Sequence, residues 1–448
     1  MQTTHGEPGR AGPDPSDVLR GGWRKRIFLA PLAGFRTCCV ASLLRATLLA
    51  TLAATGLNGA VSSAAPDQPV SDQVVRIGLL LDLSGPFAYF AGEGVALAAR
   101  MAVEDFGSKV LGYPIEVVSA DHRNLPYLAA EQASAWFDAG KVDALMDVTT
   151  TPAALAVAKI AKLKNRIVVF NAPGSVRLTN EACTPVTAHW TYDTYALAHI
   201  TAAQIVRDGG DSWYFVTADY SYGYTLEKDT AEVVRAAGGK ILGSTIHAIG
   251  NPDFQSHMLR ARQSGAKVIG LATAGTNLLM AVKAASAAGI GSDGKQRVAI
   301  FGAALNDIHT LGLATTQGLY LTSPFYWDLN DESRAWSRRF FERRNEMPNM
   351  IQAGVYSATM HYLRAVQAAG TDRTEDVMQK MREMPVDFFG TSGRLRADGR
   401  MVHDMYLFEV KRPEESTEPW DYLKLRATVP GEQAFRPLAR STCPMLKK

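Results

Sequence analysis

The chain has 448 residues, of which 47% are hydrophobic and 20% are charged. This composition excludes a disordered or fibrous protein, and the length is sufficient for two α/β lobes that each bury a core. The formal net charge is +3, and the basic residues form no clustered stripe, so we expect no nucleic-acid partner.

The first 65 residues differ in composition from the rest of the chain. A basic cluster at 24–26 precedes an uncharged apolar run at 46–57, and small residues follow at 62–65. This order is typical of a signal peptide, so we predict an export leader at 1–65 and a periplasmic mature protein. The leader holds seven basic and three acidic residues, so its removal changes the net charge from +3 to about −1. No other segment reaches the roughly 20 apolar residues of a membrane-spanning helix.

The segment 74–106 combines three features. A β-branched and leucine-rich run at 74–81 is followed by a loop of small residues at 82–92 and then by an alanine-rich stretch. This order predicts a buried parallel strand, a loop and a helix. Because free N–H groups and the helix dipole favour anions at a helix N-terminus, we expect a ligand-binding corner here.

Short apolar strands and amphipathic helices then alternate, which predicts a parallel sheet. The first set contains strands at 115–120, 144–147 and 167–170, with helices at 126–138 and 152–164. A second set follows a Pro- and Thr-rich stretch. Its expected helices are 193–207, 225–237, 254–264 and 277–288, and its strands are 213–217, 240–246, 268–272 and 298–301.

The last third of the chain indicates a return to the first set of elements. Segments 318–321 and 323–329 predict a return crossing, and a different pattern of three helices and three antiparallel strands follows it. The helices are expected at 332–345, 352–369 and 375–384, and the strands at 393–397, 406–411 and 422–427. We therefore predict an α/β fold of two doubly wound parallel-sheet lobes, joined by a hinge that the chain crosses three times. The first lobe would contain 74–188 and 324–388, and the second lobe 189–323 and 389–444.

Two cysteines, Cys183 and Cys443, lie outside the predicted leader, whereas Cys38 and Cys39 lie within it. In an oxidising compartment a single pair is more often bonded than free. We therefore predict a disulfide between Cys183 and Cys443. The alternative is a pair of buried thiols.

Several sequence blocks resemble the bacterial extracellular solute-binding proteins of the branched-chain amino-acid type. This is the leucine-binding-protein family of ABC transporters, which has the type I periplasmic binding fold. The similar blocks are the Ser84-Gly85-Pro86 loop and segments 121–124 and 171–175. Segments 189–195, 325–331 and 403–410 are similar to a branch associated with aromatic and other organic acids. The resemblance implies a monomer that closes its lobes on a small molecule and presents it to a membrane ABC permease.

Ligands of doubly wound lobes lie beyond the carboxyl ends of the strands. Hydroxyls at the helix start 149–151 would hold a carboxylate, although helix capping explains at least one of them. By resemblance the loop 171–175 also holds a carboxylate, whereas turn chemistry alone would explain its Pro-Gly pair. The first-lobe candidates are Phe90, Asp147, Thr149, Thr150, Thr151, Asn171, Gly174 and Ser175.

Aromatic residues are expected to cover the ligand from the second lobe and the hinge. Tyr222 matches a family position whose ring covers the ligand, and Phe90 stands where the family often has a tyrosine. Core packing is the alternative for Tyr222 and for Trp327. The candidates on this side are Trp190, Tyr192, Tyr222, Asn277 and Trp327.

One residue type is absent from the expected site. Amino-acid binders of this family carry a carboxylate after the strand matching 298–301, where it pairs with the ligand's ammonium group. Here the segment 302–306 reads Gly-Ala-Ala-Leu-Asn. An unpaired buried ammonium is costly. The resemblance therefore implies a carboxylate ligand without an amino group, unless Asp147 or Asp307 reaches the ligand.

Catalytic motifs are not found in the sequence. It has no nucleophile elbow, no phosphate-binding lysine motif and no His/Cys cluster with metal-ligand spacing. We therefore expect no enzyme activity, no metal and no cofactor. Three alternatives remain: a sensory module of the same fold, a branched-chain amino-acid binder, and a hydrolase on an α/β scaffold, which would turn its ligand over.

Overall fold

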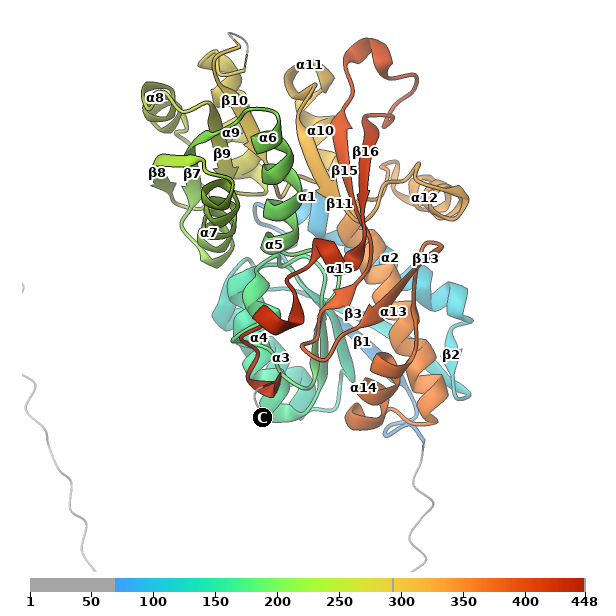
Figure 1. Cartoon of the computed structure of the whole chain (residues 1–448). Helices are drawn as coiled ribbons and strands as arrows, with labels where there is room; N and C mark the ends of the chain where they lie inside the picture. Colours follow the sequence, from blue (N-terminus) through green and yellow to red (C-terminus); the bar gives the residue numbers. More distant parts are fainter. Residues whose placement is uncertain (1–68, 292–293, 447–448) are drawn as a thin grey trace, which may run out of the picture. The chain divides into compact units, whose positions relative to one another are not determined.

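The computed structural model describes residues 69–291 and 294–446. The predicted leader at 1–65, with Cys38 and Cys39, lies outside the described residues. Two parallel sheets and two smaller antiparallel sheets organise the described chain (Figure 1). We call the six-stranded sheet with its helices the first lobe and the four-stranded sheet with its helices the second lobe.

The first lobe is built on a sheet in the order β2-β3-β1-β4-β5-β6, which is parallel except for β2. Alternate residues of β1 and β4 belong to two hydrophobic clusters, one on each face of the sheet. Burial on both faces explains why these strands are continuous apolar runs. The strands are β1 (Val75–Leu81), β2 (Lys109–Val110), β3 (Tyr113–Asp121), β4 (Ala144–Val148), β5 (Ile167–Phe170) and β6 (Thr187–His189).

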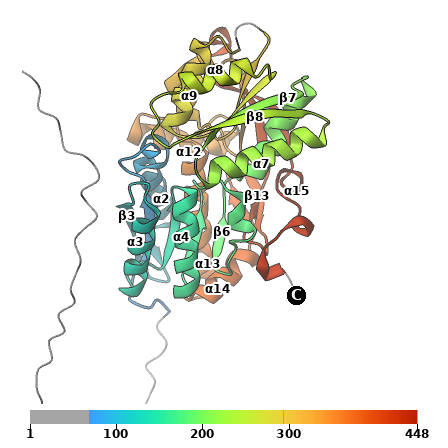
Figure 2. The same cartoon turned by 90° about the vertical axis from the view of Figure 1, so that its left-hand side faces the viewer.

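Helices cover both faces of this sheet. On one face α3 (Pro126–Asp138) packs against α4 (Thr151–Lys164), and Figure 2 shows these two helices side by side. On the other face α2 (Glu93–Phe106) packs against α13 (Met350–Ala369), which also contacts α14 (Thr374–Glu383). The first lobe therefore combines segments that lie more than 200 residues apart in the sequence.

The second lobe has an entirely parallel sheet in the order β10-β9-β7-β8. Its strands are β7 (Ser212–Ala218), β8 (Lys240–His247), β9 (Val268–Ala272) and β10 (Arg297–Ile300). Its helices include α7 (Ser221–Ala236), α8 (Gln255–Gln263), α9 (Thr276–Ala287), α10 (Leu305–Leu311) and α11 (Leu313–Thr316). The two doubly wound lobes expected from the sequence are thus confirmed.

The smaller sheets are antiparallel. One has the order β11-β15-β16 and the other the order β12-β13-β14. The first contains β11 (Tyr320–Ser323), β15 (Met405–Val410) and β16 (Leu423–Val429), and the last two strands lie where the alternating pattern predicts them. The second contains β12 (Val386–Phe388), β13 (Thr391–Leu395) and β14 (Met401–Val402), and it packs against α13 and α14.

Some elements differ from their prediction. The helix expected at 193–207 consists of α5 (Thr194–Leu197), a π-helical turn η3 (Ala198–Ala202) and α6 (Ala203–Arg207). Turns connect β11 to α12 (Asp331–Arg344), over the segment where the return crossing is expected. The strands β2, β6, β12 and β14 are not predicted by the sequence, because two or three residues are too few to establish a period of two.

Three connections lead from one lobe towards the other, and we call them the hinge. They join β6 to α5, β11 to α12 and β14 to β15. The exact lobe boundaries stay a prediction. Among the described residues, no helix is both long enough and apolar enough to cross a membrane.

The C-terminal tail returns to the first lobe after β16 and the short helix α15 (Gly431–Ala434). There Cys443 is bonded to Cys183, with 5.7 Å between the two Cα atoms, so the predicted disulfide is confirmed. The backbone N–H of Thr442 also donates a hydrogen bond of 3.0 Å to Asn180 Oδ1.

Candidate functional site

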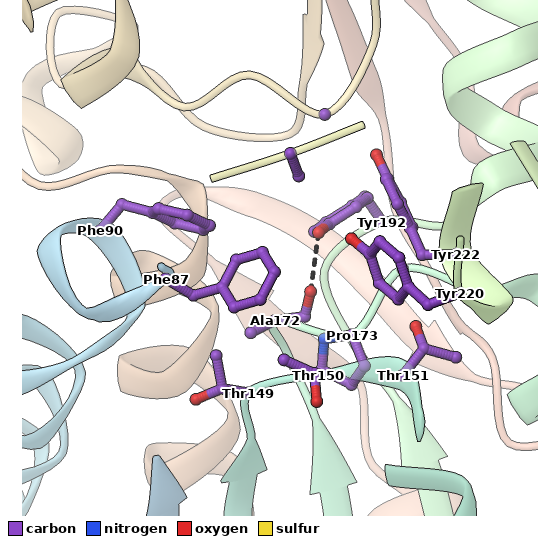
Figure 3. Close-up of a pocket in the computed structure, with 13 residues that line it drawn as sticks. Phe87, Phe90, Thr149, Thr150, Thr151, Ala172, Pro173, Tyr192, Tyr220 and Tyr222 are labelled. Carbon is purple, nitrogen blue, oxygen red and sulfur yellow. Dashed lines mark hydrogen bonds between the residues drawn. The ribbon is translucent and has the colours of Figure 1, made fainter. Parts of the chain in front are cut away.

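A small cavity lies where loops that follow strands of both parallel sheets meet (Figure 3). Loops after β1, β4, β5 and β6 form one side, and loops after β7, β9 and β10 form the other. The lining residues are Phe87, Phe90, Thr149, Thr150, Thr151, Ala172, Pro173, Gly174, Tyr192, Tyr220, Tyr222, Ala274 and Gly302. The volume is about 20 Å³, space for a single water. A larger ligand enters only if the lobes separate or the ring side chains move.

Three threonines at the start of α4 form the polar floor of the cavity. Thr149 Oγ1 accepts a hydrogen bond of 2.9 Å from the Asp82 N–H. The Thr150 and Thr151 hydroxyls are buried and have no hydrogen-bond partner among the described residues. Thr150 occupies the N-cap position of α4 without a side-chain capping bond. Helix capping therefore does not account for these two hydroxyls, which are available to a polar ligand at a helix N-terminus.

Tyrosine rings form a second wall of the cavity (Figure 3). The hydroxyls of Tyr192 and Tyr222 differ in their hydrogen bonding. The Tyr192 hydroxyl donates a hydrogen bond of 2.7 Å to the Ala172 carbonyl oxygen, so Tyr192 offers its ring to the cavity. The Tyr222 hydroxyl is buried and has no partner within the described ranges. Burial raises the pKa of Tyr222 well above its ordinary value, so this phenol stays protonated and able to donate.

Two glycines make room for these rings. A Cβ on Gly302 would lie 2.0 Å from the Tyr222 hydroxyl oxygen. A Cβ on Gly174 would lie 2.7 Å from ring carbons of both Tyr192 and Tyr222. Both distances are far below van der Waals contact, so each position requires glycine for the close approach of a ring.

Asp147 supports the site from below without lining the cavity. Its Oδ1 accepts hydrogen bonds of 2.9 Å and 3.0 Å from the backbone N–H groups of Asn171 and Ala172. Burial raises the pKa of Asp147 to about 6. The carboxyl group therefore fixes the loop after β5, which carries part of the cavity wall.

Asp307 also lies outside the cavity lining. Its carboxyl group accepts a hydrogen bond from the Tyr89 hydroxyl, and its Oδ2 accepts one of 2.6 Å from the Ala304 N–H. Burial raises the pKa of Asp307 to about 7. Neither aspartate that the sequence suggested for an ammonium group lines the cavity. Both carboxyl oxygens of Asp307 have a partner, whereas Asp147 Oδ2 is buried without one among the described residues.

Two polar candidates beside the cavity have structural partners. Asn171 Nδ2 donates a hydrogen bond of 2.9 Å to the Met146 carbonyl oxygen, and Asn171 Oδ1 accepts one of 3.0 Å from Thr191. The Ser175 hydroxyl lies 3.0 Å from that of Thr225 on α7, a contact between the lobes. Both residues hold loops in place and do not line the cavity.

Three further candidates lie elsewhere. Trp190 is fully buried, and its indole N–H donates a hydrogen bond of 3.4 Å to the Ser357 hydroxyl. Asn277 Oδ1 accepts a bond of 3.1 Å from the Gly250 N–H. The Trp327 indole donates a bond of 2.8 Å to the Trp420 carbonyl oxygen. The structure thus places all three away from the cavity.

Several lining residues are not among the candidates, although Ala172, Pro173 and Gly302 lie in the expected segments 171–175 and 302–306. Phe87 lies in the same loop as Phe90, and Tyr220 precedes Tyr222 by two residues, so proximity to a candidate was the available signal. Ala172, Pro173, Ala274 and Gly302 have no polar or aromatic side chain that would have marked them.

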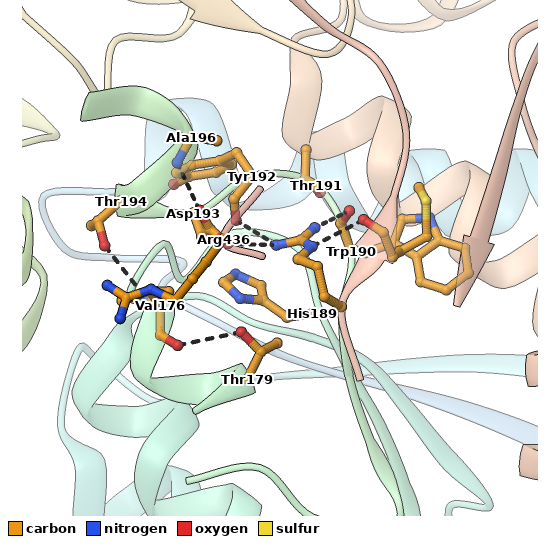
Figure 4. Close-up of polar contacts among 12 residues, drawn as sticks. Val176, Thr179, His189, Trp190, Thr191, Tyr192, Asp193, Thr194, Ala196 and Arg436 are labelled. Atoms are coloured by element: carbon orange, nitrogen blue, oxygen red, sulfur yellow. Dashed lines mark hydrogen bonds and ion pairs between the residues drawn. The ribbon is translucent and has the colours of Figure 1, made fainter. Parts of the chain in front are cut away.

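The first hinge connection carries Tyr192, which Figure 4 shows beside Trp190, Thr191 and Asp193. A buried cation, Arg400, holds this connection. The Arg400 guanidinium donates a hydrogen bond of 3.1 Å to the Tyr192 carbonyl oxygen and another to that of Trp190. His403 Nε2 lies 2.8 Å from the Thr191 carbonyl oxygen. These contacts fix the backbone from which the Tyr192 ring reaches the cavity.

The cavity contains no ionisable acid or base apart from the tyrosine phenols. In the described parts of the chain, no group of three His, Cys, Asp or Glu side chains is arranged to hold a metal ion. The site combines apolar rings, unpartnered hydroxyls and a helix N-terminus. Such a set can hold a molecule with an apolar body and a polar or anionic end.

Comparisons with known proteins agree with the fold. A family described as "Periplasmic binding protein" matches residues 74–417. The chain is 45% identical to a periplasmic binding protein from Burkholderia mallei, with a TM-score of 0.82, covering 84% of this chain and 100% of that one. It is 34% identical to a branched chain amino acid ABC transporter periplasmic ligand-binding protein from Burkholderia xenovorans LB400, with a TM-score of 0.75 and coverage of 83% and 99%. It is also 25% identical over 375 residues to "Leu/Ile/Val-binding protein homolog 6" from Brucella melitensis, covering 80% of this chain and 93% of that protein.

Proposed function

Because this chain belongs to the periplasmic binding protein family, we propose that it binds a small organic acid without an amino group and delivers it to an ABC permease. The ligand would carry an aromatic or other apolar body. The family consists of solute-binding proteins and not of a class of enzymes. Its members are exported, so we assign the mature chain to the periplasm and the segment 1–65 to its signal peptide.

The proposal depends on one observation. The cavity is lined by uncharged side chains, and some of their buried hydroxyls have no hydrogen-bond partner among the described residues. Thr150, Thr151 and Tyr222 each bring a hydroxyl that has no partner among the described residues. Buried hydroxyls are normally hydrogen-bonded, so these three favour a ligand with acceptor oxygens. The N-terminus of α4 adds a positive electrostatic potential at the same place. A carboxylate fits this set of donors.

The apolar part of the ligand would lie among the rings. Phe87 and Phe90 face the cavity from the first lobe, and Tyr192, Tyr220 and Tyr222 from the hinge and the second lobe. Rings on both sides favour a flat or branched apolar body by dispersion and burial of apolar surface. Contacts from both sides also make binding stronger in the closed form, so the ligand shifts the lobes towards closure.

A specific observation favours a second candidate, a branched-chain amino acid. The 34% identical protein from Burkholderia xenovorans is described as a branched chain amino acid ligand-binding protein. An ammonium group would need an anionic partner, because burying an unpaired charge is expensive. Asp307 is bonded to Tyr89 and to the Ala304 N–H, and Asp147 Oδ1 is bonded to a neighbouring loop, while neither carboxyl group lines the cavity. The organic acid is therefore the first candidate.

Pairs of compounds that differ only in the amino group test the proposal. We would measure thermal stabilisation and binding heat with 4-methylpentanoate against leucine, and with 3-phenylpropanoate against phenylalanine. We expect at least one acid to bind while its amino-acid counterpart does not. Binding of leucine without binding of either acid would overturn the proposal and establish the second candidate. Release of a chemically altered product would instead indicate an enzyme.

A further inference from the structure

We propose that Tyr89 and Asp307 form a latch across the cleft, which favours the closed form and slows release of the ligand. The inference rests on the proposed function, because a latch has a role only if the lobes open and close around a bound molecule. It adds two residues that do not line the cavity to the set that determines how long a ligand stays bound.

The latch joins the two lobes by a single hydrogen bond. Tyr89 lies on the short helix α1 (Ala88–Ala91), between β1 and α2 of the first lobe. Asp307 lies on α10, which follows β10 of the second lobe. The Tyr89 hydroxyl donates to Asp307 Oδ1, while Asp307 Oδ2 accepts a bond of 2.6 Å from the Ala304 N–H. Asp307 is 1% exposed and Tyr89 is half-buried, so the bond is partly shielded from water, which strengthens it.

The position of this bond connects it to the ligand site. Tyr89 precedes Phe90, which lines the cavity, and the two rings lie 5.0 Å apart. A second contact between the lobes is close by, because the Thr276 N–H donates a bond of 3.2 Å to the Pro86 carbonyl oxygen. Any opening that separates the loop after β1 from α10 must break the bond between Tyr89 and Asp307.

Breaking the latch exposes both groups to water, so its net contribution is that of one hydrogen bond to a carboxyl group. We expect the loss of this one bond to shift the closing equilibrium by about tenfold towards the open form. This contribution belongs to the closed form alone, so it slows opening without adding a contact to the ligand.

The chain offers a matched control within one lobe. The Tyr356 hydroxyl on α13 donates a bond of 2.7 Å to Asp105 Oδ2 on α2, and both helices belong to the first lobe. Tyr356→Phe therefore removes the same kind of bond without affecting contact between the lobes. Tyr89→Phe keeps the aromatic ring, so both variants are expected to fold.

The first experiment needs no ligand. Spin labels would be attached to cysteines introduced at the exposed positions Leu163 on α4 and Leu259 on α8, with the native disulfide kept oxidised. Distances between the labels report the fraction of closed molecules. We expect Tyr89→Phe to lower this fraction relative to the unchanged chain, and Tyr356→Phe to leave it unchanged. Equal fractions in the two variants would overturn the latch.

The second experiment measures release of 3-phenylpropanoate, or of 4-methylpentanoate if only that acid binds, by rapid dilution. We expect release about tenfold faster in Tyr89→Phe and unchanged in Tyr356→Phe. Asp307→Asn keeps an acceptor for the Tyr89 hydroxyl. Its release rate should therefore be closer to that of the unchanged chain than the release rate of Asp307→Ala is. If neither acid binds, the proposed function fails, whereas the distances still test the latch. Release at the same rate from both phenylalanine variants would contradict the latch.

Discussion

Arg400 and Asp193 form an ion pair inside the hinge, with 3.6 Å between Arg400 Nη1 and Asp193 Oδ2 and each side chain 1% exposed. Asp193 also accepts a hydrogen bond of 2.9 Å from the Ala196 N–H and thereby caps α5. Burial lowers the pKa of Arg400 to about 10, so the guanidinium remains charged at neutral pH. The pair therefore links the first hinge connection, between β6 and α5, to the start of β14, from which the third connection leads to β15.

Replacing this arginine should destabilise the protein strongly. Arg400→Met leaves Asp193 as an unpaired buried charge, removes the donor of the Tyr192 carbonyl oxygen and leaves that of Trp190 with His403 alone. Breaking a buried pair in this way costs about 3–5 kcal/mol. Urea unfolding would measure the loss in the free energy of unfolding.

The control for this variant is Arg394→Met. Arg394 pairs with Glu432 on the surface, where the two side chains are 55% and 65% exposed. Exposed pairs contribute about 0–1 kcal/mol. The free energy of unfolding of this variant should therefore be close to that of the unchanged chain. Similar losses for Arg394→Met and Arg400→Met would contradict the role assigned to the buried pair.

A steric test addresses the wall of the cavity. Gly302→Ala would place a methyl group against the Tyr222 hydroxyl and push the ring out of position. We expect lower stability and weaker binding of any acid that binds the unchanged chain. Tyr222→Phe removes the hydroxyl, so the double variant should recover stability relative to Gly302→Ala alone. Thermal unfolding of the four proteins measures this coupling, and strictly additive losses would contradict the contact.

The three threonines should respond differently to loss of their hydroxyls. Thr149→Val leaves the Asp82 N–H without its acceptor and should cost about 1 kcal/mol of stability. Thr150→Val and Thr151→Val remove hydroxyls without partners in the described chain, so they should cost little stability yet weaken acid binding. Calorimetry and thermal unfolding separate the two effects. Loss of stability without loss of affinity in the last two variants would argue against a ligand role.

The disulfide should matter for stability and not for the ligand. Cys183 and Cys443 are separated by 260 residues, and the chain-entropy picture gives about 5 kcal/mol for closing so long a loop. The bond lies outside the cavity lining. Reduction should therefore lower the melting temperature and expose the tail to limited proteolysis, while affinity for the acid stays the same. Free-thiol labelling of both cysteines in the native protein would contradict the bond.

Stability should decrease as the pH rises towards 7. Burial raises the pKa of Asp307 from its ordinary 3.8 to about 7, so the folded protein binds this proton more tightly than the unfolded chain does. The stabilising effect is complete below about pH 4 and is lost as the pH passes through 7. Asp307→Asn lacks this dependence, so its melting temperature relative to the unchanged chain should rise between pH 5 and pH 8. Parallel curves would contradict the shift.

Much of the fold could be predicted from the sequence, because the burial of a strand or helix determines its pattern of apolar residues. β1 and β4 are buried on both faces, and this produces the apolar runs from which the strands were predicted. The π-helical turn at Ala198–Ala202 left no such pattern, because five residues are too few to shift the period of the helix around it. Strands of two residues likewise carry no period.

The candidate site was predictable only in part, because chain position fixes a loop but not the direction of each side chain. Thr150 and Thr151 directly follow β4 and line the cavity as expected. Asn277 also lies at a helix start, yet it turns to the Gly250 N–H. The partner of Trp327 is the carbonyl oxygen of Trp420, 93 residues away, and no local pattern predicts such a contact.

The course of the C-terminal tail has a mechanical consequence. β16 belongs to a sheet that packs beside the second lobe, whereas Cys443 is bonded to Cys183 in the first lobe. The residues 430–442 between them therefore form a covalently anchored strap alongside the three hinge connections. Whatever rotation separates the lobes must also be absorbed by this strap, so the tail has to bend together with the hinge each time the site opens.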